Sequence, residues 1–308
     1  MQTNNLNSIT PPFLKKGDQI EIIATARFVS KQTVYDSINI IESFDLKAKC
    51  NINFLSKRNI FSDNKINRLN ALQNALNSKE NKAIFFARGG YGTVQLLDSV
   101  DFSILLQHPK WLVGFSDITI ILNHILKLYN LKSIHGPMPF NYPHTKQDHI
   151  ASIFQILKGK KNKILVKANS QNILGTGTGK LIGGNLSIIY SLMGSKSLFN
   201  LGKKSILFIE DVDEYLYHIE RMMYSLNRCG LLKEINGLIV GGMDKIKDNE
   251  LQFGKSIQDI IINVCEKYKY PICFDFPSGH SKDNHPLIIG ETIKLSVNKV
   301  CAKIDYIK

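Results

Sequence analysis

The chain of 308 residues is 44% hydrophobic and 21% charged, which is typical of globular proteins and long enough for two domains. No apolar run reaches the roughly 18 residues that span a bilayer, and the amino terminus lacks the features of a secretory signal. The formal net charge is +13, but the lysines are dispersed and form no basic helix or aromatic-basic ladder. We therefore expect a cytoplasmic protein with neither a membrane nor a nucleic-acid partner, whose positive field can attract an anionic substrate.

The first half of the chain alternates predicted strands with predicted helices. The strands are expected at residues 17–24, 47–54, 83–87 and 132–135, with a further strand and its elbow at 111–117. The helices are expected at 31–44, 65–78 and 93–99, and from the elbow to about 128. This alternation is typical of a parallel sheet flanked by helices. We therefore predict an amino-terminal α/β domain over residues 1–157.

The pattern changes after residue 157. Residues 158–180 are rich in Lys and Gly, and we predict a connection between domains there. Residues 181–308 are expected to form a carboxy-terminal domain in which strands and helices alternate less regularly. The expected strands are 205–209, 237–241 and segments near 271–275 and 291–305, and the expected helices are a segment ending near 193, 216–228 and 255–267.

The five cysteines are odd in number and scattered along the chain. They form neither the close pairs of a zinc site nor a recognisable disulfide framework. A reducing compartment fits this distribution best, and we predict no metal site.

One stretch points to chemistry. Residues 111–117 read Trp-Leu-Val-Gly-Phe-Ser-Asp, and an apolar sequence with helical spacing follows them. This pattern predicts a strand, a sharp turn carrying Ser116, and a helix. A turn of this kind lifts a hydroxyl out of a parallel sheet and places it beside backbone N–H groups that can stabilise an oxyanion.

A serine nucleophile needs a base, and the base is usually oriented by a carboxylate. Among eight histidines we select His280, because it lies in a loop after a predicted strand. Glu210 and Asp211 end a predicted buried strand, which gives a carboxylate a fixed direction. Three further acids compete with them for the orienting role: Asp213, Glu214 and Glu220.

The glycine-rich segment Arg88-Gly89-Gly90-Tyr91-Gly92 has three interpretations. It resembles a phosphate-binding loop but lacks the Lys-Ser/Thr ending of a P-loop. It could instead bring backbone N–H groups to the Ser116 oxyanion, or serve only as a tight turn between a strand and a helix.

Taken together, these stretches resemble the LD-carboxypeptidase family of S66 serine peptidases, over nearly the whole chain and in order. The matching motifs are Gly17-Asp18-Gln19-Ile20, Ala87-Arg88-Gly89-Gly90-Tyr91-Gly92, His108-Pro109-Lys110-Trp111, Gly114-Phe115-Ser116-Asp117-Ile118-Thr119, His135-Gly136-Pro137-Met138, Gly183-Gly184-Asn185-Leu186-Ser187, Leu207-Phe208-Ile209-Glu210-Asp211 and Gly279-His280. The sequence departs from the family at Ala24-Thr25-Ala26-Arg27, where a Pro-Ser is usual, and at Ser195-Lys196, where a Thr-Pro is usual.

The resemblance implies a fold, a site and an activity. The fold would pair a parallel α/β domain with a smaller, β-rich, swivelling-type domain, and the protein would be a homodimer. The catalytic triad would be Ser116, Glu210 and His280. The N–H of Asp117 and an N–H of the Gly89-Gly90 turn would form the oxyanion hole.

The expected reaction is cytoplasmic release of the terminal D-Ala from a cell-wall tetrapeptide, a small muropeptide substrate, without metal or organic cofactor. Arg88 is expected to bind the substrate's terminal carboxylate, because a guanidinium matches that planar group. One alternative is the immunity branch of the same family, which cuts aminoacyl-adenylate antibiotics and would need an aromatic residue to stack on adenine. Another is a nucleotide- or muropeptide-binding protein without catalysis.

Overall fold

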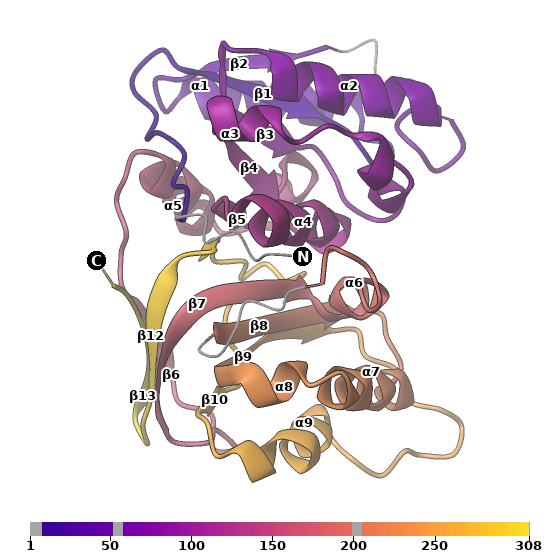
Figure 1. Ribbon diagram of the computed structural model, residues 1–308, viewed down its shortest axis with the longest axis vertical. Coiled ribbons are helices and arrows are strands. Elements are labelled where there is room, and N and C mark those ends of the chain that lie inside the picture. The colour runs from indigo at the N-terminus through magenta and orange to yellow at the C-terminus, as the bar shows by residue number, and fades with distance from the viewer. Residues whose placement is uncertain (1–7, 52–57, 199–204, 308) are drawn as a thin grey trace. The chain divides into compact units, whose positions relative to one another are not determined.

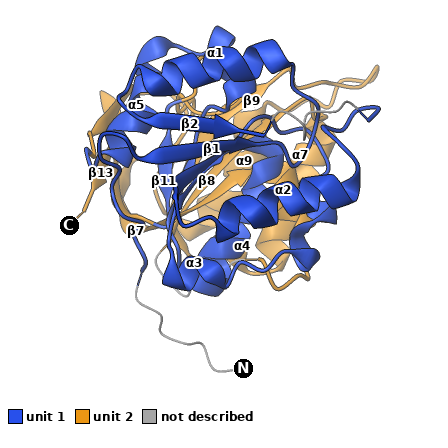
Figure 2. Cartoon of the chain, turned by 90° about the horizontal axis from the view of Figure 1, so that it is seen from above, with its two compact units in different colours: residues 1–160, 285–290 blue, residues 161–284, 291–308 orange. Residues whose placement is uncertain are grey.

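The computed structural model describes residues 8–51, 58–198 and 205–307, which form two compact units (Figures 1 and 2). Unit 1 contains the chain up to Lys160 together with His285–Gly290, and unit 2 contains Lys161–Asn284 and the chain from Glu291 onward. Each unit has its own sheet, and the mixed α/β class predicted from the sequence is confirmed.

Unit 1 is built on a six-stranded sheet with the order β11-β5-β4-β3-β1-β2. Its strands are β1 (Gln19–Ile23), β2 (Lys47–Cys50), β3 (Asn81–Phe86), β4 (Trp111–Gly114), β5 (Ser133–His135) and β11 (Leu287–Ile289). The first five are parallel, whereas β11 pairs antiparallel with β5. The central strands are buried on both faces, which explains their continuous apolar sequences. Residues 52–54 of the predicted second strand lie outside the described residues.

Helices cover both faces of this sheet. They are α1 (Lys31–Glu42), α2 (Lys65–Asn77), α3 (Ile104–Gln107), α4 (Thr119–Tyr129) and α5 (Gln147–Leu157). Figure 2 shows α1 and α5 on one face and α2, α3 and α4 on the other. The expected helix over 93–99 is instead two short 3-10 helices, η2 (Thr93–Gln95) and η3 (Leu97–Ser99).

Unit 2 has a seven-stranded mixed sheet with the order β10-β9-β8-β7-β12-β13-β6. Strands β7, β8, β9 and β10 are parallel, and β12, β13 and β6 continue the sheet antiparallel. The strands are β6 (Ile164–Lys167), β7 (Gly175–Asn185), β8 (Ser205–Val212), β9 (Ile235–Asp244), β10 (Ile272–Cys273), β12 (Thr292–Val297) and β13 (Cys301–Tyr306). The helices are α6 (Leu186–Ser191), α7 (Leu216–Arg228), α8 (Leu231–Glu234) and α9 (Ile257–Cys265).

The segment expected to connect the domains contributes two strands to unit 2, β6 and the first part of β7. The glycines of β7 read as loop residues in the sequence, but close packing requires them. A Cβ on Gly177 would lie 1.9 Å from the carbonyl oxygen of Asn236, and one on Gly183 would lie 1.9 Å from that of Phe208. The backbone of β7 therefore approaches its neighbours at distances that no side chain permits.

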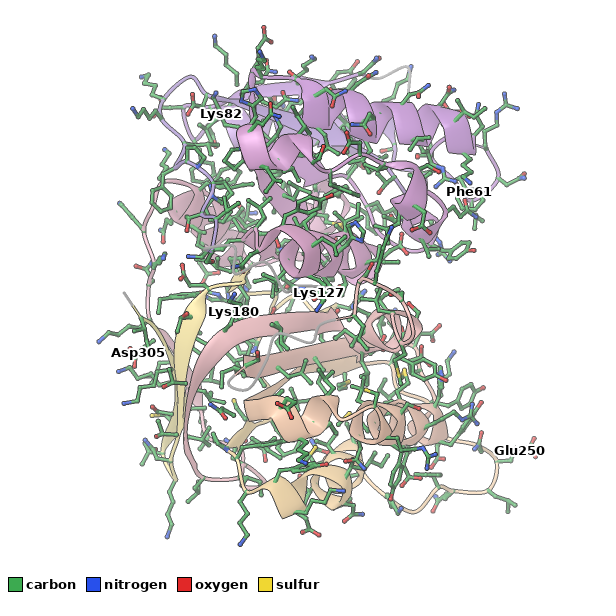
Figure 3. The ribbon with its side chains drawn as sticks, in the orientation of Figure 1. Phe61, Lys82, Lys127, Lys180, Glu250 and Asp305 are labelled. Carbon is green, nitrogen blue, oxygen red and sulfur yellow. The ribbon has the colours of Figure 1, made fainter. Side chains whose placement is uncertain are left out.

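Charged side chains are found on both units, as Lys82 and Glu250 illustrate (Figure 3). Within the described part of the chain, no helix has both the length and the apolar character needed to cross a bilayer.

Candidate active site

Ser116 lies at the carboxyl end of β4. Strand β4 ends at Gly114, and Ser116 begins the 3-10 helix η4 (Ser116–Ile118), which leads into α4. The φ angle of Ser116 is 60°, in the left-handed region that residues other than glycine seldom occupy. Ser116 is half-buried, whereas its neighbours Phe115 and Asp117 are buried. A strained serine between a strand and a helix is the geometry of a nucleophile elbow.

The glycine-rich turn after β3 packs directly against Ser116. A Cβ on Gly89 would lie 3.0 Å from Cβ of Ser116 and 3.2 Å from its Oγ. Because β3 and β4 are adjacent parallel strands, their carboxyl ends bring the turn and the elbow to the same edge of the sheet. Glycine at position 89 therefore leaves room for the side chain of Ser116.

Arg88 and Gly90 flank that glycine, and each has a close neighbour on another segment of unit 1. A guanidinium N–H of Arg88 donates to the carbonyl oxygen of Phe28 at 2.8 Å, and its Cζ lies 3.8 Å from the centroid of the Phe140 ring. Burial and the nearby charge of Arg27 lower the pKa of Arg88. Gly90 has a φ of 108°, and a Cβ there would lie 2.5 Å from Cδ of Arg27. Arg88 in the turn and Arg27 beside it therefore give this turn a positive charge, a favourable setting for an anionic substrate group.

The side chain of Asp117 points into unit 1 and supports the turn. It is buried, and its Oδ2 accepts a hydrogen bond from the backbone N–H of Thr93 at 3.0 Å. Burial raises the pKa of Asp117, while the hydrogen bond from Thr93 and the charges of Arg68 and Arg27 act in the opposite direction. The carboxylate is therefore structural, and the backbone N–H is the part of Asp117 suited to an oxyanion.

Glu210 and His280 form a close pair within unit 2. Glu210 lies near the end of β8 and is fully buried, and His280 lies in the loop after β10 with 17% of its side chain exposed. Their closest atoms, Oε2 of Glu210 and Nδ1 of His280, are 2.7 Å apart. Glycine precedes the histidine because a Cβ on Gly279 would lie 3.3 Å from Oε2 of Glu210 and 3.1 Å from the backbone nitrogen of Gly242.

Three carboxylates set the basicity of His280. Burial lowers its pKa, but Glu210, Asp211 and Asp244 raise it, and the net result is a pKa above the ordinary value of 6.5. Asp244, at the end of β9, also accepts a hydrogen bond from the backbone N–H of His280. With Nδ1 directed at Glu210, Nε2 is the ring nitrogen suited to exchange a proton with a hydroxyl.

Asp211 has a different role from Glu210, although the two are adjacent. Its carboxylate accepts hydrogen bonds from the side chain of Asn185 at 2.9 Å and from the backbone N–H of Ser187 at 2.8 Å. Burial and the charge of Glu210 raise the pKa of Asp211 to about 6. Asp211 therefore fixes the start of α6 to β8.

The other candidate acids and several histidines have different partners. Asp213 pairs with Lys247, Glu214 with His218 and Glu220 with Lys255. Aromatic rings pack against His124, His135 and His149. Of the acids that the sequence left in competition, Glu210 is thus the one paired with His280.

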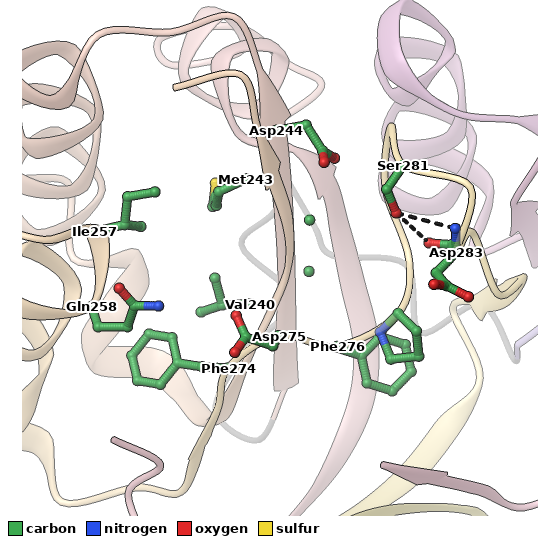
Figure 4. A pocket seen from close by; sticks show the side chains of 13 residues that line it. Val240, Met243, Asp244, Ile257, Gln258, Phe274, Asp275, Phe276, Ser281 and Asp283 are labelled. Carbon is green, nitrogen blue, oxygen red and sulfur yellow. Dashed lines mark hydrogen bonds between the residues drawn. The ribbon is translucent and has the colours of Figure 1, made fainter. Parts of the chain in front are cut away.

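A cavity of about 380 Å³ in unit 2 adjoins the loop that carries His280 (Figure 4). Ser281 and Asp283 form one wall, and Asp244 and Phe276 form others. Two hydrogen bonds join the hydroxyl of Ser281 to the backbone of Asp283 and stiffen this wall. Asp244 therefore contacts both the loop and the cavity. The only local signal for it in the sequence is the pair of glycines shortly before it, Gly241 and Gly242.

The structure thus describes two groups of candidate residues, each within its own unit. Unit 1 contains Ser116 with the turn of Arg88, Gly89 and Gly90, and unit 2 contains the Glu210–His280 pair.

Comparison with known families gives two matches in chain order. The family model of the LD-carboxypeptidase N-terminal domain (S66 peptidases) matches residues 20–136, and that of the C-terminal domain matches residues 178–295. The first match contains Ser116, and the second contains Glu210 and His280.

Individual relatives agree with these matches. The chain is 28% identical over 306 residues to a probable murein peptide carboxypeptidase of Bacillus subtilis, covering 96% of this chain and 94% of the relative. It is 29% identical over 247 residues to the murein tetrapeptide carboxypeptidase of Pseudomonas aeruginosa, covering 76% and 78%.

Solved structures show the same fold. A muramoyltetrapeptide carboxypeptidase from Oxalobacter formigenes superposes with a TM-score of 0.85 at 25% identity, covering 94% of this chain and all of that one. The microcin C7 self-immunity protein MccF, in complex with aspartyl sulfamoyl adenosine, superposes with a TM-score of 0.83 at 18% identity, covering 96% and 98%.

Proposed function

Because this chain belongs to the LD-carboxypeptidase family of S66 serine peptidases, we propose that it releases the terminal D-Ala from cell-wall tetrapeptides during peptidoglycan recycling. The observation that carries this proposal is that the buried Glu210 carboxylate lies 2.7 Å from Nδ1 of His280. This contact orients the imidazole so that it can act as a general base. The murein carboxypeptidases among its relatives support the choice of substrate.

The proposed triad joins this pair to Ser116. Chain connectivity supports the assignment: the loop that carries His280 continues past Asn284 into β11, a strand of unit 1. There Leu287 pairs with His135, and His135 pairs with Gly114, two residues before Ser116. The base is thus tethered to the sheet that carries the nucleophile.

In the proposed mechanism, Nε2 of His280 removes the Ser116 proton as the hydroxyl oxygen attacks the carbonyl between the L-centre of the diamino acid and the terminal D-Ala. Glu210 orients the imidazole and stabilises its protonated form. The N–H groups of Asp117 and of Gly89 or Gly90 bind the oxyanion, with about 3–4 kcal/mol from each donor. The imidazolium gives its proton to the departing D-Ala amine, and a water molecule then hydrolyses the acyl-enzyme. Arg88 binds the carboxylate of the D-Ala.

The location and assembly of the enzyme belong to the same proposal. Dispersed cysteine thiols favour the reducing cytoplasm, where turned-over muropeptides are degraded. The family resemblance supports a homodimer, and analytical ultracentrifugation tests it.

A second candidate substrate is an aminoacyl adenylate, since the fold is also that of the MccF structures. Such a substrate calls for an aromatic ring to stack on the adenine. The single Trp of the chain does not serve, because Trp111 is fully buried in β4 and its indole N–H donates to the carbonyl oxygen of Pro12. This placement leaves the stacking role to an exposed Tyr or Phe, such as Tyr91 or Phe140, and the choice of the cell-wall substrate rests on the relatives.

Mass spectrometry after incubation with each substrate distinguishes the two activities. We expect loss of one D-Ala from a murein tetrapeptide and no cleavage of an aminoacyl sulfamoyl or phosphoramidate adenylate. Cleavage of the adenylate alone would favour the second candidate, and no cleavage of either, without fluorophosphonate labelling, would indicate a binding protein. Ser116→Ala should abolish D-Ala release, and wild-type turnover in that variant would refute the assignment of the nucleophile.

A further inference from the structure

Arg68, on α2, is a buried cation whose guanidinium binds three segments of unit 1, at residues 25, 63 and 92–95. Only 2% of the residue is exposed. The acceptors are the carbonyl oxygens of Asp63, Thr25 and Gly92, at 3.2, 2.6 and 3.0 Å, and Oε1 of Gln95 at 2.6 Å. Burying a guanidinium costs free energy unless its N–H groups find acceptors. Because these N–H groups have a fixed planar geometry, the segments that supply the acceptors are held in one arrangement.

One of those segments, residues 92–95, borders the proposed oxyanion hole. Gly92 ends the glycine-rich turn whose N–H groups are proposed to bind the oxyanion. Thr93 follows it, and its N–H donates to the carboxylate of Asp117, the residue after the nucleophile. The hydroxyl of Thr93 also lies 3.0 Å from that of Thr25, whose carbonyl oxygen Arg68 holds. Arg68 and Asp117 therefore bind the same peptide group, Arg68 at the carbonyl oxygen of Gly92 and Asp117 at the N–H of Thr93.

The surroundings of Arg68 are built around its position. A Cβ on Gly92, where φ is 132°, would lie 2.7 Å from Nη1 of Arg68, so only glycine permits the close approach. The ring of Phe61, labelled in Figure 3, covers the guanidinium with its centroid 4.6 Å from Cζ. The charge of Arg68 also opposes the effect of burial on the pKa of Asp117, although burial prevails and the net pKa is raised.

We propose that Arg68 is a positioning residue that fixes the separation between the N–H of Asp117 and the N–H groups of the Gly89-Gly90 turn, and so preorganises the oxyanion hole. This inference rests on the proposed function, since it assigns those N–H groups to the transition state. It acts through the backbone and involves no contact between Arg68 and substrate. A wider hole weakens binding of the tetrahedral oxyanion while leaving ground-state binding almost unchanged.

The test compares Arg68→Lys and Arg68→Met with the wild-type enzyme. Lysine keeps the charge but lacks the planar fork that reaches several carbonyl oxygens at once. We expect a fall in kcat of about 10–100-fold for Arg68→Lys and more for Arg68→Met, with KM within about threefold of wild type. Active sites are counted by end-point labelling of Ser116 with a fluorophosphonate, so that kcat refers to folded enzyme only.

One control variant limits the effect to the bonds of Arg68. Lys65→Met removes an exposed charge from the first turn of α2. It should retain kcat within about twofold. Wild-type kcat per active site in Arg68→Lys and Arg68→Met, or a loss confined to the number of active sites, would overturn the proposal.

The rate constant of fluorophosphonate labelling separates this inference from the choice of substrate. Phosphonylation of Ser116 passes through a similar oxyanion, so the rate should fall in parallel with kcat in both Arg68 variants. If wild-type protein is labelled but cleaves no tetrapeptide, the substrate assignment fails and the labelling rates still decide the role of Arg68. If wild-type protein is not labelled, both proposals fail.

Discussion

Oε2 of Glu210 lies 2.7 Å from Nδ1 of His280, although 70 residues separate them in the chain. The Glu210 carboxylate is fully buried, whereas the His280 imidazole is partly exposed. The ring is therefore accessible, and the carboxylate that stabilises its protonated form lies in the interior of the unit. This asymmetry is what a general base requires, because the orienting group stays fixed while the ring exchanges protons.

Substitution Glu210→Gln should lower kcat by about 10²–10⁴-fold, because the amide neither fixes the imidazole tautomer nor stabilises the imidazolium. The measurement is D-Ala release from a tetrapeptide by enzyme of verified fold. Glu214→Gln is the matched control, since Glu214 lies outside the proposed site and pairs with His218 of α7 at 2.5 Å. Equal losses of activity in the two variants would contradict a special role for Glu210.

The pH dependence of kcat/KM should report the protonation of His280. Burial lowers the pKa of this histidine, but the surrounding carboxylates together raise it by more, so the net pKa lies above 6.5. Since the base must be neutral, activity should fall as the pH drops through that raised pKa and level off above it.

The same experiment on Glu210→Gln adds a directional check. Glu210 is the strongest of the groups that raise the pKa of His280, so its removal should move the acidic limb of the profile to lower pH. A limb at the same pH in both proteins would assign it to another group. The rate of fluorophosphonate labelling as a function of pH gives the same information without a peptide substrate.

Substitution Gly89→Ala should impair catalysis with little effect on folding. The φ angle of Gly89 is outside the left-handed region, so alanine fits the backbone, but its methyl group would lie 3.0–3.2 Å from the Ser116 side chain. A displacement of the nucleophile of this kind costs on the order of 10²-fold in rate. Steady-state kinetics and thermal unfolding measure the two effects, and an alanine variant with wild-type kcat would argue against contact between the turn and the nucleophile.

The strain at Ser116 should be visible in stability. Both Ser116→Ala and Ser116→Gly remove the hydroxyl, but only glycine tolerates a φ of 60° without steric cost. That cost is about 1–2 kcal/mol, and the greater freedom of glycine in the unfolded chain offsets about 0.5–1 kcal/mol of it. Urea unfolding should therefore show the glycine variant to be more stable by about 1 kcal/mol or slightly less, and a more stable alanine variant would indicate an unstrained turn.

Local sequence patterns were sufficient to predict the elbow at Ser116. An apolar strand, a glycine and a helical repeat are short-range signals, and β4, η4 and α4 follow them. The parallel sheet of unit 1 was predictable for the same reason, because strands and helices alternate there at regular spacing.

Features that depend on distant packing were not predictable. The glycines of β7 indicate a loop until the carbonyl oxygens of Asn236 and Phe208 are placed beside them. The residues alone left several acids as partners of His280, and only the fold and the family resemblance single out Glu210. Arg68 and Asp244 belong to no sequence motif. Arg68 binds carbonyl oxygens that lie 24 and 43 residues away in the chain. Asp244 links β9 to the loop after β10.

Strand β11 is encoded late in the chain but completes the edge of the amino-terminal sheet beside β5. During synthesis, β5 therefore has one side unpaired until Leu287–Ile289 has left the ribosome. An unpaired strand edge is a template for intermolecular association. A fragment ending at Lys160 would retain that open edge permanently, so the first 160 residues should be prone to aggregation unless Leu287–Ile289 is supplied as a peptide or fused behind them.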